Sequence, residues 1–572
     1  MTDPQIMLTE RVQQALAAAF GPEHSDADPL IRPSQFADFQ ANVAMSLGKR
    51  LRRAPREVAT ELAAQLADFP GTVEVSGPGF LNITLDDSWI AAQAQAQLGD
   101  PLNGVVQGEP QRVVIDYSAP NAAKEMHVGH LRSTVVGDAL ARTHEHLGDT
   151  VIRQNHLGDW GTPFGMLVEH LVDIGEQAAV AQLEAGQGTA YYQAARVKFD
   201  SDETFKARSR ARVTTLQSED PETIRLWHVF MNATIAYFDK IYTQLQVTLT
   251  DADIAGESKY NPWLEQVCDD LEAAGIAVIS DGALCVFPPG FTGSDDQPLP
   301  LIIRKSDGGY GYATTDLAAI RYRVDELKAD RSLYVVGADQ ALHFRMVFAA
   351  AKMAGWLPDS VSFEHVQIGM VQGKDGKRFK TRSGESVKLS SLLDEAVERA
   401  SAAIADRGYS PELQSEIAQA VGIGAVKYAD LSVSHDSEYI FDFDRMIAFT
   451  GNTGGYMQYA TARIRSIFRN GGVDVDAVNG PVLLGESAER ALALQLLGFG
   501  AVISQVAELS EPHRLCAFLY ETASLFSTFY EECPVLKSEG LIKASRLALC
   551  ALTLRTLETG LSLLGVPVPE RM

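Results

Sequence analysis

One segment constrains the fold of this 572-residue chain more than any other, because it alternates strand and helix patterns over a short distance. Residues 113–117 (VVIDY) form an apolar run typical of a buried strand, and residues 150–154 form a second one. Residues 131–147, between them, have a helical pattern. A strand–helix–strand unit with buried strands is the building block of a doubly wound parallel sheet. The sequence therefore predicts an α/β domain in which ligands bind where strands end and helices begin.

The chain is too long for a single hydrophobic core, and its residue patterns change along its length. Short β-like runs follow a helical apolar stripe in the N-terminal part. A long, mostly helical stretch then interrupts the α/β pattern, before apolar runs resume at 301–304 and 333–336. We therefore expect five regions: an α+β domain (1–105), the first half of the α/β domain (106–168), a mostly helical insertion (169–300), the second half of the α/β domain (301–409) and a helical bundle (410–572).

Composition narrows the class of protein. Apolar residues make up 46 % and charged residues 22 % of the chain, which is typical of a folded globular protein. We find no run of about 18 apolar residues and no basic-then-apolar N-terminal segment, so we expect no membrane partner and no secretory signal. The five cysteines are dispersed without a C-x-x-C pair, which is typical of reduced thiols in the cytoplasm and offers no zinc site. The net charge of −25 argues only weakly against a nucleic-acid partner, because phosphate binding requires a local basic surface.

The turn after the first strand carries the residues best suited to bind phosphate. Within IDYSAPNAAKEMHVGHLRSTVVGDAL, residues 115–140, His127 and His130 stand at the helix start, where free backbone N–H groups and the helix dipole favour an anion. Both imidazoles can donate to phosphate oxygens, Gly129 lets a flat base approach the backbone, and Lys124 adds a positive charge. Two histidines on a helix are more often structural, so the motif indicates a nucleotide site only because of its context. No Walker-type or G-x-G-x-x-G motif accompanies it, which disfavours ordinary kinase and dehydrogenase functions.

A second candidate element lies far along the chain. GMVQGKDGKRFKTRSGESVKL, residues 369–389, is a Gly-rich and strongly basic loop in an otherwise acidic chain. Such a loop can close over a triphosphate and neutralise charge at the α-phosphate, although most basic loops are simply solvated. If both elements serve one site, they must meet across the split sheet and hold the triphosphate between them. The candidate ATP-binding residues of the loop are Lys377, Arg378, Phe379, Lys380, Thr381 and Arg382.

Together the two elements resemble the signature sequences of class I aminoacyl-tRNA synthetases, in the form typical of the arginine-specific family. P-N-x-x-K-x-x-H-x-G-H matches the first signature, whereas the second, Lys-Met-Ser-Lys in most members, is replaced here by residues 378–381 (RFKT). In members with this degenerate loop the lysine before the first signature, Lys124 in this sequence, is thought to compensate. The resemblance implies a Rossmann-like catalytic domain with an insertion, an N-terminal α+β appendage and an all-α anticodon-binding bundle. It also implies ATP with Mg²⁺, L-arginine and tRNA(Arg) as ligands, no zinc, and a monomeric cytoplasmic enzyme.

The implied reaction forms arginyl-adenylate from L-arginine and ATP, and then transfers arginine to the 3′-terminal adenosine of the tRNA, with release of pyrophosphate and AMP. His127, Gly129, His130 and Lys124 match the catalytic positions of the family. A guanidinium group is planar, permanently charged and carries five donors, so a selective pocket needs carboxylates and other acceptors. The resemblance assigns the arginine pocket to Asp116, Asn121, Tyr312, Asp316 and Gln340, with Asn121 at the α-amino end and Tyr312 and Asp316 on one helical face. Family members often carry Glu at the position of Asp116.

Two further segments indicate contacts with RNA. GYMQYATARIRSIFRN, residues 455–470, contains Tyr456, Tyr459 and Arg463 on one helical face. Aromatic rings and arginine suit unpaired bases, although the same residues can equally form the core of a bundle. The segment resembles the anticodon-binding domain of the family. In the N-terminal region Phe80 and Asn82 match positions that contact the tRNA elbow, although a Phe in a short strand is more often core.

Three other functions are compatible with parts of the pattern. A class I synthetase for another amino acid would share both signatures, but the cysteine enzyme requires a zinc cluster that this sequence does not display. A small-molecule adenylyl- or nucleotidyl-transferase would share H-x-G-H but not two flanking tRNA-binding regions. A non-catalytic tRNA-binding paralogue would carry a vestigial adenylation site, which the intact His127, Gly129, His130 and Lys124 argue against.

Overall fold

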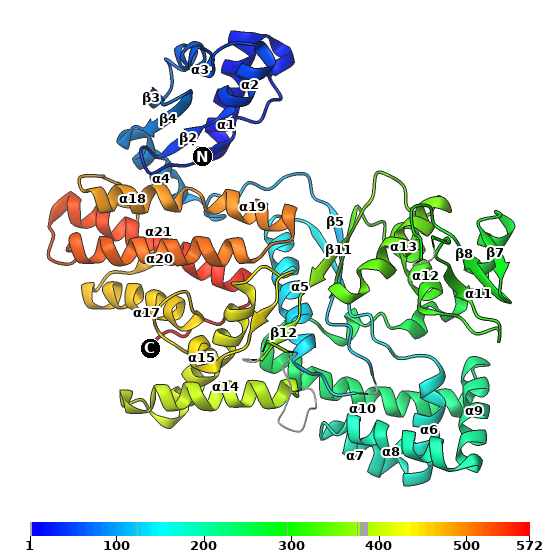
Figure 1. Ribbon diagram of the computed structural model, residues 1–572. Helices are drawn as coiled ribbons and strands as arrows, with labels where there is room; N and C mark the ends of the chain where they lie inside the picture. Colours follow the sequence, from blue (N-terminus) through cyan, green and yellow to red (C-terminus); the bar gives the residue numbers. More distant parts are fainter. Residues whose placement is uncertain (1–2, 123, 294–295, 374–375, 378–386) are drawn as a thin grey trace.

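The computed structural model describes residues 3–572 with the exception of residues 123, 294–295, 374–375 and 378–386. A parallel sheet lies near the middle of the molecule, with a helical bundle on one side and the inserted segments on the other (Figure 1). The N-terminal domain, drawn in blue, rests on the bundle, drawn in orange and red, and is remote from the sheet.

The central sheet has four parallel strands in the order β11–β10–β5–β6. Strand β5 (Arg112–Asp116) pairs with β6 (Thr150–Gln154) on one side and with β10 (Arg331–Gly337) on the other, and β10 pairs with β11 (Ser362–Ile368). Helix α5 (Val128–His146) connects β5 to β6. These strands confirm the predicted doubly wound parallel sheet. The change of direction between β5 and β10 creates a switch point, which is where such sheets bind ligands.

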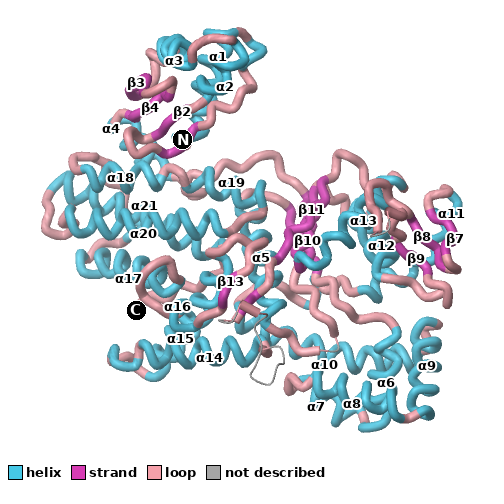
Figure 2. The backbone as a smooth tube through the Cα atoms, in the orientation of Figure 1, coloured by secondary structure: helices cyan, strands magenta, loops and turns pink. Residues whose placement is uncertain are grey.

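The prediction that residues 301–304 rejoin this sheet is wrong. Strand β9 (Leu301–Arg304) pairs antiparallel with β8 (Ala283–Val286), which pairs antiparallel with β7 (Ala277–Ser280), and the three form a sheet of their own. Helix α11 (Leu264–Ala273) shares a hydrophobic core with them. An apolar run of four residues fits either sheet, so the run alone does not identify its partner strand. Figure 2 shows this small sheet across the molecule from the helical bundle.

The inserted region extends on both sides of residues 169–300. Helix α6 (Thr162–Ile174) begins before residue 169, and the small sheet ends with β9, after residue 300. Two helices that flank β10, α12 (Tyr312–Asp325) and α13 (Ala341–Met353), contribute to the core of the small sheet. The remaining helices of the insertion are α7 (Glu176–Glu184), α8 (Gly188–Ser201), α9 (Glu203–Gln217) and α10 (Pro221–Leu245).

The N-terminal residues form the expected α+β domain, whose antiparallel sheet has the order β1–β2–β4–β3. Its elements are α1 (Pro4–Phe20), β1 (Ile31–Pro33), β2 (Phe39–Ala41), α2 (Val43–Leu51), α3 (Pro55–Ala64), β3 (Gly71–Ser76) and β4 (Phe80–Leu85). Helix α4 (Asp87–Gly99) follows and leads to the bundle. Arg490 of the bundle donates two hydrogen bonds of 2.7 and 2.8 Å to Asp38 and one of 2.6 Å to Asp87, both in the N-terminal region. Charged contacts therefore attach the N-terminal domain to the bundle.

The C-terminal residues form the expected helical bundle, and a helix before residue 410 packs along it. Its main helices are α14 (Leu389–Ala403), α15 (Pro411–Leu431), α17 (Gly454–Gly471), α18 (Ser487–Leu496), α19 (Phe499–Leu509), α20 (His513–Glu532) and α21 (Gly540–Leu563). Among the described residues one helical stretch, Ser487–Leu509, has the length and apolar character of a membrane span. This stretch packs against α20 and α21, and 56 % of its apolar window is buried, as the core of a bundle requires.

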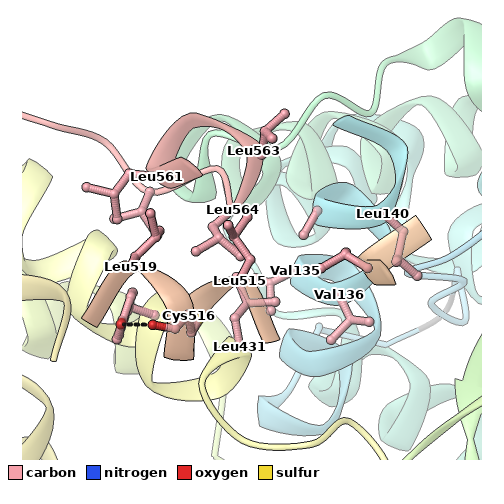
Figure 3. Packing of buried hydrophobic residues seen from close by; sticks show 14 of the residues in the cluster. Val135, Val136, Leu140, Leu431, Leu515, Cys516, Leu519, Leu561, Leu563 and Leu564 are labelled. Carbon is pink, nitrogen blue, oxygen red and sulfur yellow. Dashed lines mark hydrogen bonds between the residues drawn. The ribbon is translucent and has the colours of Figure 1, made fainter. Parts of the chain in front are cut away.

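Helix α5 lies between the sheet and the bundle, so both determine its position. Figure 3 shows apolar side chains from α5, α15, α20 and α21 gathered in one cluster. The cluster includes Val135, Val136, Leu140, Leu431, Leu515, Leu519, Leu561 and Leu564, all of them buried. The bundle thereby helps to hold the helix whose first turn carries His127 and His130.

Candidate active site

A cavity of about 370 Å³ lies at the switch point, at the carboxyl ends of β5, β10 and β11 and beside the start of α5. Its lining includes His127, Gly129 and His130, so the first predicted element faces it. Ser118 and Ala119, shortly after β5, also line the cavity and have positive φ angles of 69° and 45°. Non-glycine residues in this left-handed region are strained, and such residues cluster at functional sites.

The two histidines are oriented by backbone N–H groups. The N–H of His127 donates to Nδ1 of His130 over 3.0 Å, and the N–H of Gly129 donates to Nδ1 of His127 over 3.0 Å. A neutral imidazole whose Nδ1 accepts a hydrogen bond carries its proton on Nε2. In the neutral state both rings therefore offer an Nε2–H donor, and their centroids are 4.0 Å apart.

His130 is a neutral donor at physiological pH. Burial, and after it the neighbouring His127, lower the pKa of His130 from 6.5 to about 3. The ring can therefore donate to an anion without bringing a positive charge. Any cation that balances the charge of a bound triphosphate must come from another part of the chain.

The basic loop returns to the first element. Residues 126–128 pair with residues 387–389 through two backbone hydrogen bonds of 3.0 and 2.9 Å, which flank a bridge between His127 and Lys388. At the other end of the loop, strand β12 (Val371–Gln372) begins at the cavity wall. The two predicted elements therefore meet at one site. Lys377 is described, whereas Arg378, Phe379, Lys380, Thr381 and Arg382 lie outside the described residues.

Lys124 and Asn121 precede helix α5 in the chain and are not among the residues that line the cavity. The Nζ atom of Lys124 is 5.1 Å from the ring centre of Tyr192 in α8, so this lysine contacts the insertion. Asn121 forms a backbone bridge with Gly158. Its side-chain oxygen lies so close to Gly158 that a Cβ atom on this glycine would not fit. Both predicted residues are exposed.

The carboxylate of Asp116 already has a guanidinium partner within the chain. Asp116 is 4 % exposed and accepts a hydrogen bond of 2.6 Å from Nη2 of Arg323, a fully buried residue of α12. The Nε atom of Arg323 also donates to Gln154 over 3.0 Å. The negative charge of Asp116 is therefore balanced inside the fold, which the sequence did not reveal because Arg323 comes from a distant helix.

The other predicted arginine-binding residues come from neighbouring helix starts. Asp316 of α12 forms a hydrogen bond of 2.5 Å with Nε2 of His343 at the start of α13. This contact joins α12 to α13. Tyr312, the first residue of α12, is 74 % exposed. Gln340 is also exposed and ends the short 3₁₀ helix η4 (Ala338–Gln340), which directly precedes α13. Sequence reasoning missed His343, because a single histidine gives no sign of a carboxylate partner on another helix.

Sequence reasoning also missed Glu257, an acidic residue near Asp316. Burial, followed by repulsion from Asp159 and Asp316, raises the pKa of Glu257 from 4.5 to about 8. Carboxyl groups close enough to repel one another make a negatively charged environment, which suits a guanidinium group. Glu257 lies in no recognisable motif, and only tertiary contacts bring it near Asp316.

The N-terminal residues predicted to contact tRNA are partly accessible. Phe80 and Asn82 are half-buried on the outer face of β4, whereas Leu81 and Ile83 between and beyond them are fully buried. Asn82 accepts a hydrogen bond of 2.8 Å from the side chain of Gln40. The strand therefore alternates core and surface residues, and Phe80 belongs to the surface set.

The predicted residues of α17 lie along α20. The hydroxyl of Tyr456 is 3.3 Å from that of Ser527, and Tyr459 is 38 % exposed. The guanidinium of Arg463 lies 4.3 Å from the ring centre of Tyr530, a partly exposed residue that the sequence analysis missed. An arginine on an accessible aromatic ring offers a surface on which bases can stack.

Metal-binding groups are not evident in the described part of the chain: no three or more His, Cys, Asp or Glu residues are placed to hold an ion together. All five cysteines are buried and form no disulfide.

Family models match most of the chain. The model for the catalytic domain of class I tRNA synthetases (R) matches residues 94–443, and the model for the DALR anticodon binding domain matches residues 457–572. The model for the arginyl tRNA synthetase N terminal domain matches residues 7–85.

Similar proteins cover the whole chain. An arginine–tRNA ligase of Thermobifida fusca is 61 % identical over 100 % of both chains, and one of Frankia casuarinae is 51 % identical over 99 % of both. The crystal structure of an arginyl-tRNA synthetase from Plasmodium falciparum is 27 % identical and superposes with a TM-score of 0.85 over 100 % of both chains. That of Thermus thermophilus is 23 % identical, with a TM-score of 0.78 over 99 % of both, and supports the fold.

The lowered pKa of His130 predicts that its ring does not titrate between pH 5 and pH 8 and stays in the Nε2–H form. Because the pKa in the folded state, about 3, is below the ordinary value of 6.5, the unfolded chain binds more protons between these values. The contribution of His130 to stability is therefore lost as the pH falls through this window. NMR spectra of ring-¹⁵N-labelled histidine, with the exposed His228 as reference, measure this directly. A His130 resonance that titrates near pH 6.5 would contradict the prediction.

Proposed function

The chain belongs to the arginyl-tRNA synthetases of class I and ligates arginine to tRNA with ATP, and we propose that this reaction takes place in the cavity at the switch point. The pairing of residues 126–128 with 387–389 carries the proposal, because it joins the histidine element to the base of the basic loop beside that cavity. A nucleotide in the cavity would therefore lie within reach of both elements.

In the proposed first step, a carboxylate oxygen of arginine attacks the α-phosphorus of ATP. A new O–P bond forms while the bond to the bridging oxygen breaks, and pyrophosphate leaves with Mg²⁺. The Nε2–H groups of His127 and His130 donate to phosphate oxygens as charge develops, and Lys377, Arg378, Lys380 and Arg382 supply positive charge. The enzyme forms no covalent intermediate, so its contribution is positioning and charge stabilisation.

In the proposed second step, a ribose hydroxyl of the terminal adenosine attacks the carbonyl carbon of the adenylate. The hydroxyl loses its proton, the ester bond forms, and AMP leaves. Gly129 allows the base of ATP to approach the backbone, and Phe379 and Thr381 belong to the loop that closes over the phosphates. Lys124 supplies a further positive charge beside the site.

We assign recognition of arginine to the helix starts beside the cavity. Asp316 accepts hydrogen bonds from the guanidinium group of the substrate arginine, and Tyr312 and Gln340 provide further acceptors for it. Asn121 binds the α-amino group of the substrate. Asp116 acts through Arg323, since its charge is already paired. A pKa of about 8 keeps Glu257 mostly protonated at neutral pH, so we propose that it becomes negatively charged near Asp316 when a guanidinium group binds there.

We assign tRNA binding to both ends of the chain. Tyr456, Tyr459 and Arg463 would meet the anticodon loop, and Phe80 and Asn82 the elbow. The partial exposure of Tyr459 and the half-exposed positions of Phe80 and Asn82 support these contacts. We further propose that the protein acts as a monomer in the cytoplasm, and its five buried cysteines without a disulfide support a reducing compartment.

ATP–pyrophosphate exchange tests the active site. In assays run with and without total tRNA, we expect exchange with arginine and with no other amino acid, and only when tRNA is present. His130→Ala should lower the exchange rate ~10²–10³-fold without unfolding the chain, because one positioned donor to developing charge is lost. His228→Ala, at an exposed position on α10, is the matched control and should behave as wild type. Near-wild-type exchange by His130→Ala would refute the assignment.

Asp316→Ala tests the arginine pocket. The KM for arginine should rise roughly 10–150-fold with little change in the KM for ATP, because a hydrogen bond to a charged group contributes about 1.5–3 kcal/mol. Asp325→Ala, on the same helix but exposed at its far end, should leave both values unchanged. Steady-state aminoacylation kinetics measure the difference, and an unchanged KM for arginine in Asp316→Ala would exclude this role.

A further inference from the structure

One wall of the cavity comes from a segment that follows α15, a helix packed against the C-terminal bundle. Residues 434–440, here called the strap, follow helix α15 and precede α17, the helix with the proposed anticodon-binding residues. Asp436 and Glu438 of the strap line the same cavity as His127 and His130. The proposed ATP site is therefore completed by a segment at the C-terminal end of the region that matches the catalytic domain.

The strap is attached to the end of β11. Its strand β13 (Tyr439–Ile440) pairs with β12, and His435 bonds to the carbonyl of Gln367 through Nδ1 over 2.7 Å. The N–H of Gly369 donates to the carbonyl of His435 over 2.7 Å. A Cβ atom at Gly369 would lie 2.5 Å from the carbonyl oxygen of Ser437, so the two backbones are in direct contact.

Arg132 ties the strap to helix α5, two residues after His130. Its side chain is 1 % exposed and donates to Asp430 of α15 over 3.2 Å. It also donates to the backbone carbonyls of Ser437 over 2.6 Å, Ser434 over 3.1 Å and Gly369 over 3.2 Å. The guanidinium lies 5.0 Å from the ring centre of Tyr439. One buried cation thus gathers α5, α15, the strap and the segment after β11.

We propose that Arg132 is a positioning residue for ATP, which holds the strap so that Asp436 and Glu438 close the cavity. The proposal rests on the proposed nucleotide site. Ser437 lies between the two cavity-lining carboxylates, and Gly369 itself lines the cavity, so the atoms that Arg132 binds are part of the wall or adjacent to it. The planar fork of arginine can reach three carbonyls at once, which the single nitrogen of lysine cannot do. A bundle that docks incorrectly would therefore open the ATP site.

Arg142 provides a matched control on the same helix. It also pairs with a buried carboxylate, Asp138, over 2.8 Å, and it donates to the carbonyl of Gln246 over 2.9 Å. None of these partners lines the cavity. Arg142→Met should therefore reproduce the loss of a buried ion pair without moving the strap.

Kinetics of Arg132→Met, Tyr439→Leu and Arg142→Met in the full chain test the proposal. Arg132→Met should raise the KM for ATP about tenfold or more and leave the KM for arginine within about twofold, because only the nucleotide wall shifts. Tyr439→Leu, which removes the ring beneath the guanidinium and keeps the ion pair, should change the KM for ATP in the same direction by a smaller factor. Arg132→Lys should restore little of the wild-type KM for ATP, because lysine cannot reach three carbonyls at once. Backbone hydrogen exchange at residues 434–440 should become faster in Arg132→Met and in Tyr439→Leu, the two strap variants. It should stay unchanged there in Arg142→Met.

Two results would overturn the proposal. One is a folded Arg132→Met with the wild-type KM for ATP, and the other is an equal rise of both KM values in Arg132→Met and Arg142→Met. If Arg132→Met does not fold, Tyr439→Leu decides, and unchanged ATP kinetics in that variant count against the strap. His130→Ala separates this failure from that of the nucleotide site. If His130→Ala impairs ATP–pyrophosphate exchange while the strap variants do not, only the role of Arg132 is refuted. If none of these variants affects the use of ATP, the nucleotide site itself is misassigned.

Discussion

Backbone hydrogen bonds between residues 126–128 and 387–389 join two parts of the chain that a long insertion separates. They fix the base of the basic loop beside His127, at the first turn of α5 and next to the switch point of the sheet. Backbone bonds of this kind need no particular side chains, so they tolerate the degenerate second signature. The loop residues can differ from those of other class I enzymes while the loop still begins and ends at the same cavity.

Helix α5 is the structural link between this site and the rest of the molecule. Its apolar side chains pack against the bundle (Figure 3), and its buried charged side chains reach α15 and the segment that follows α10. Lys427 of α15 donates to the carbonyl of Leu245 over 2.8 Å, and burial lowers its pKa to about 8. Buried ion pairs add little net stability, but removing one partner alone is strongly destabilising. These groups therefore select one arrangement of bundle and sheet more than they strengthen it.

Much of the catalytic half could be read from the sequence, because its signals are local. The strands at 113–117 and 150–154 and the helix between them have patterns that depend only on neighbours in the chain. His127 and His130 became candidates because they stand at a helix start, where anions bind, and because the surrounding motif resembles the first signature of the family. The partner strand of residues 301–304 could not be predicted, because an apolar run fits more than one sheet.

The sequence by itself indicated the α/β architecture and the flanking domains, since periodicity is a property of short stretches. The resemblance of two short motifs indicated the family and the two candidate phosphate-binding segments. Only the tertiary structure decided which charges meet. Arg323 balances Asp116, His343 contacts Asp316, and Glu257 lies near Asp316. Arg132 likewise gathers carbonyls from two distant segments. The physical reason is that electrostatic interactions depend on distance in space, and the separation of two residues along the chain carries almost no information about that distance.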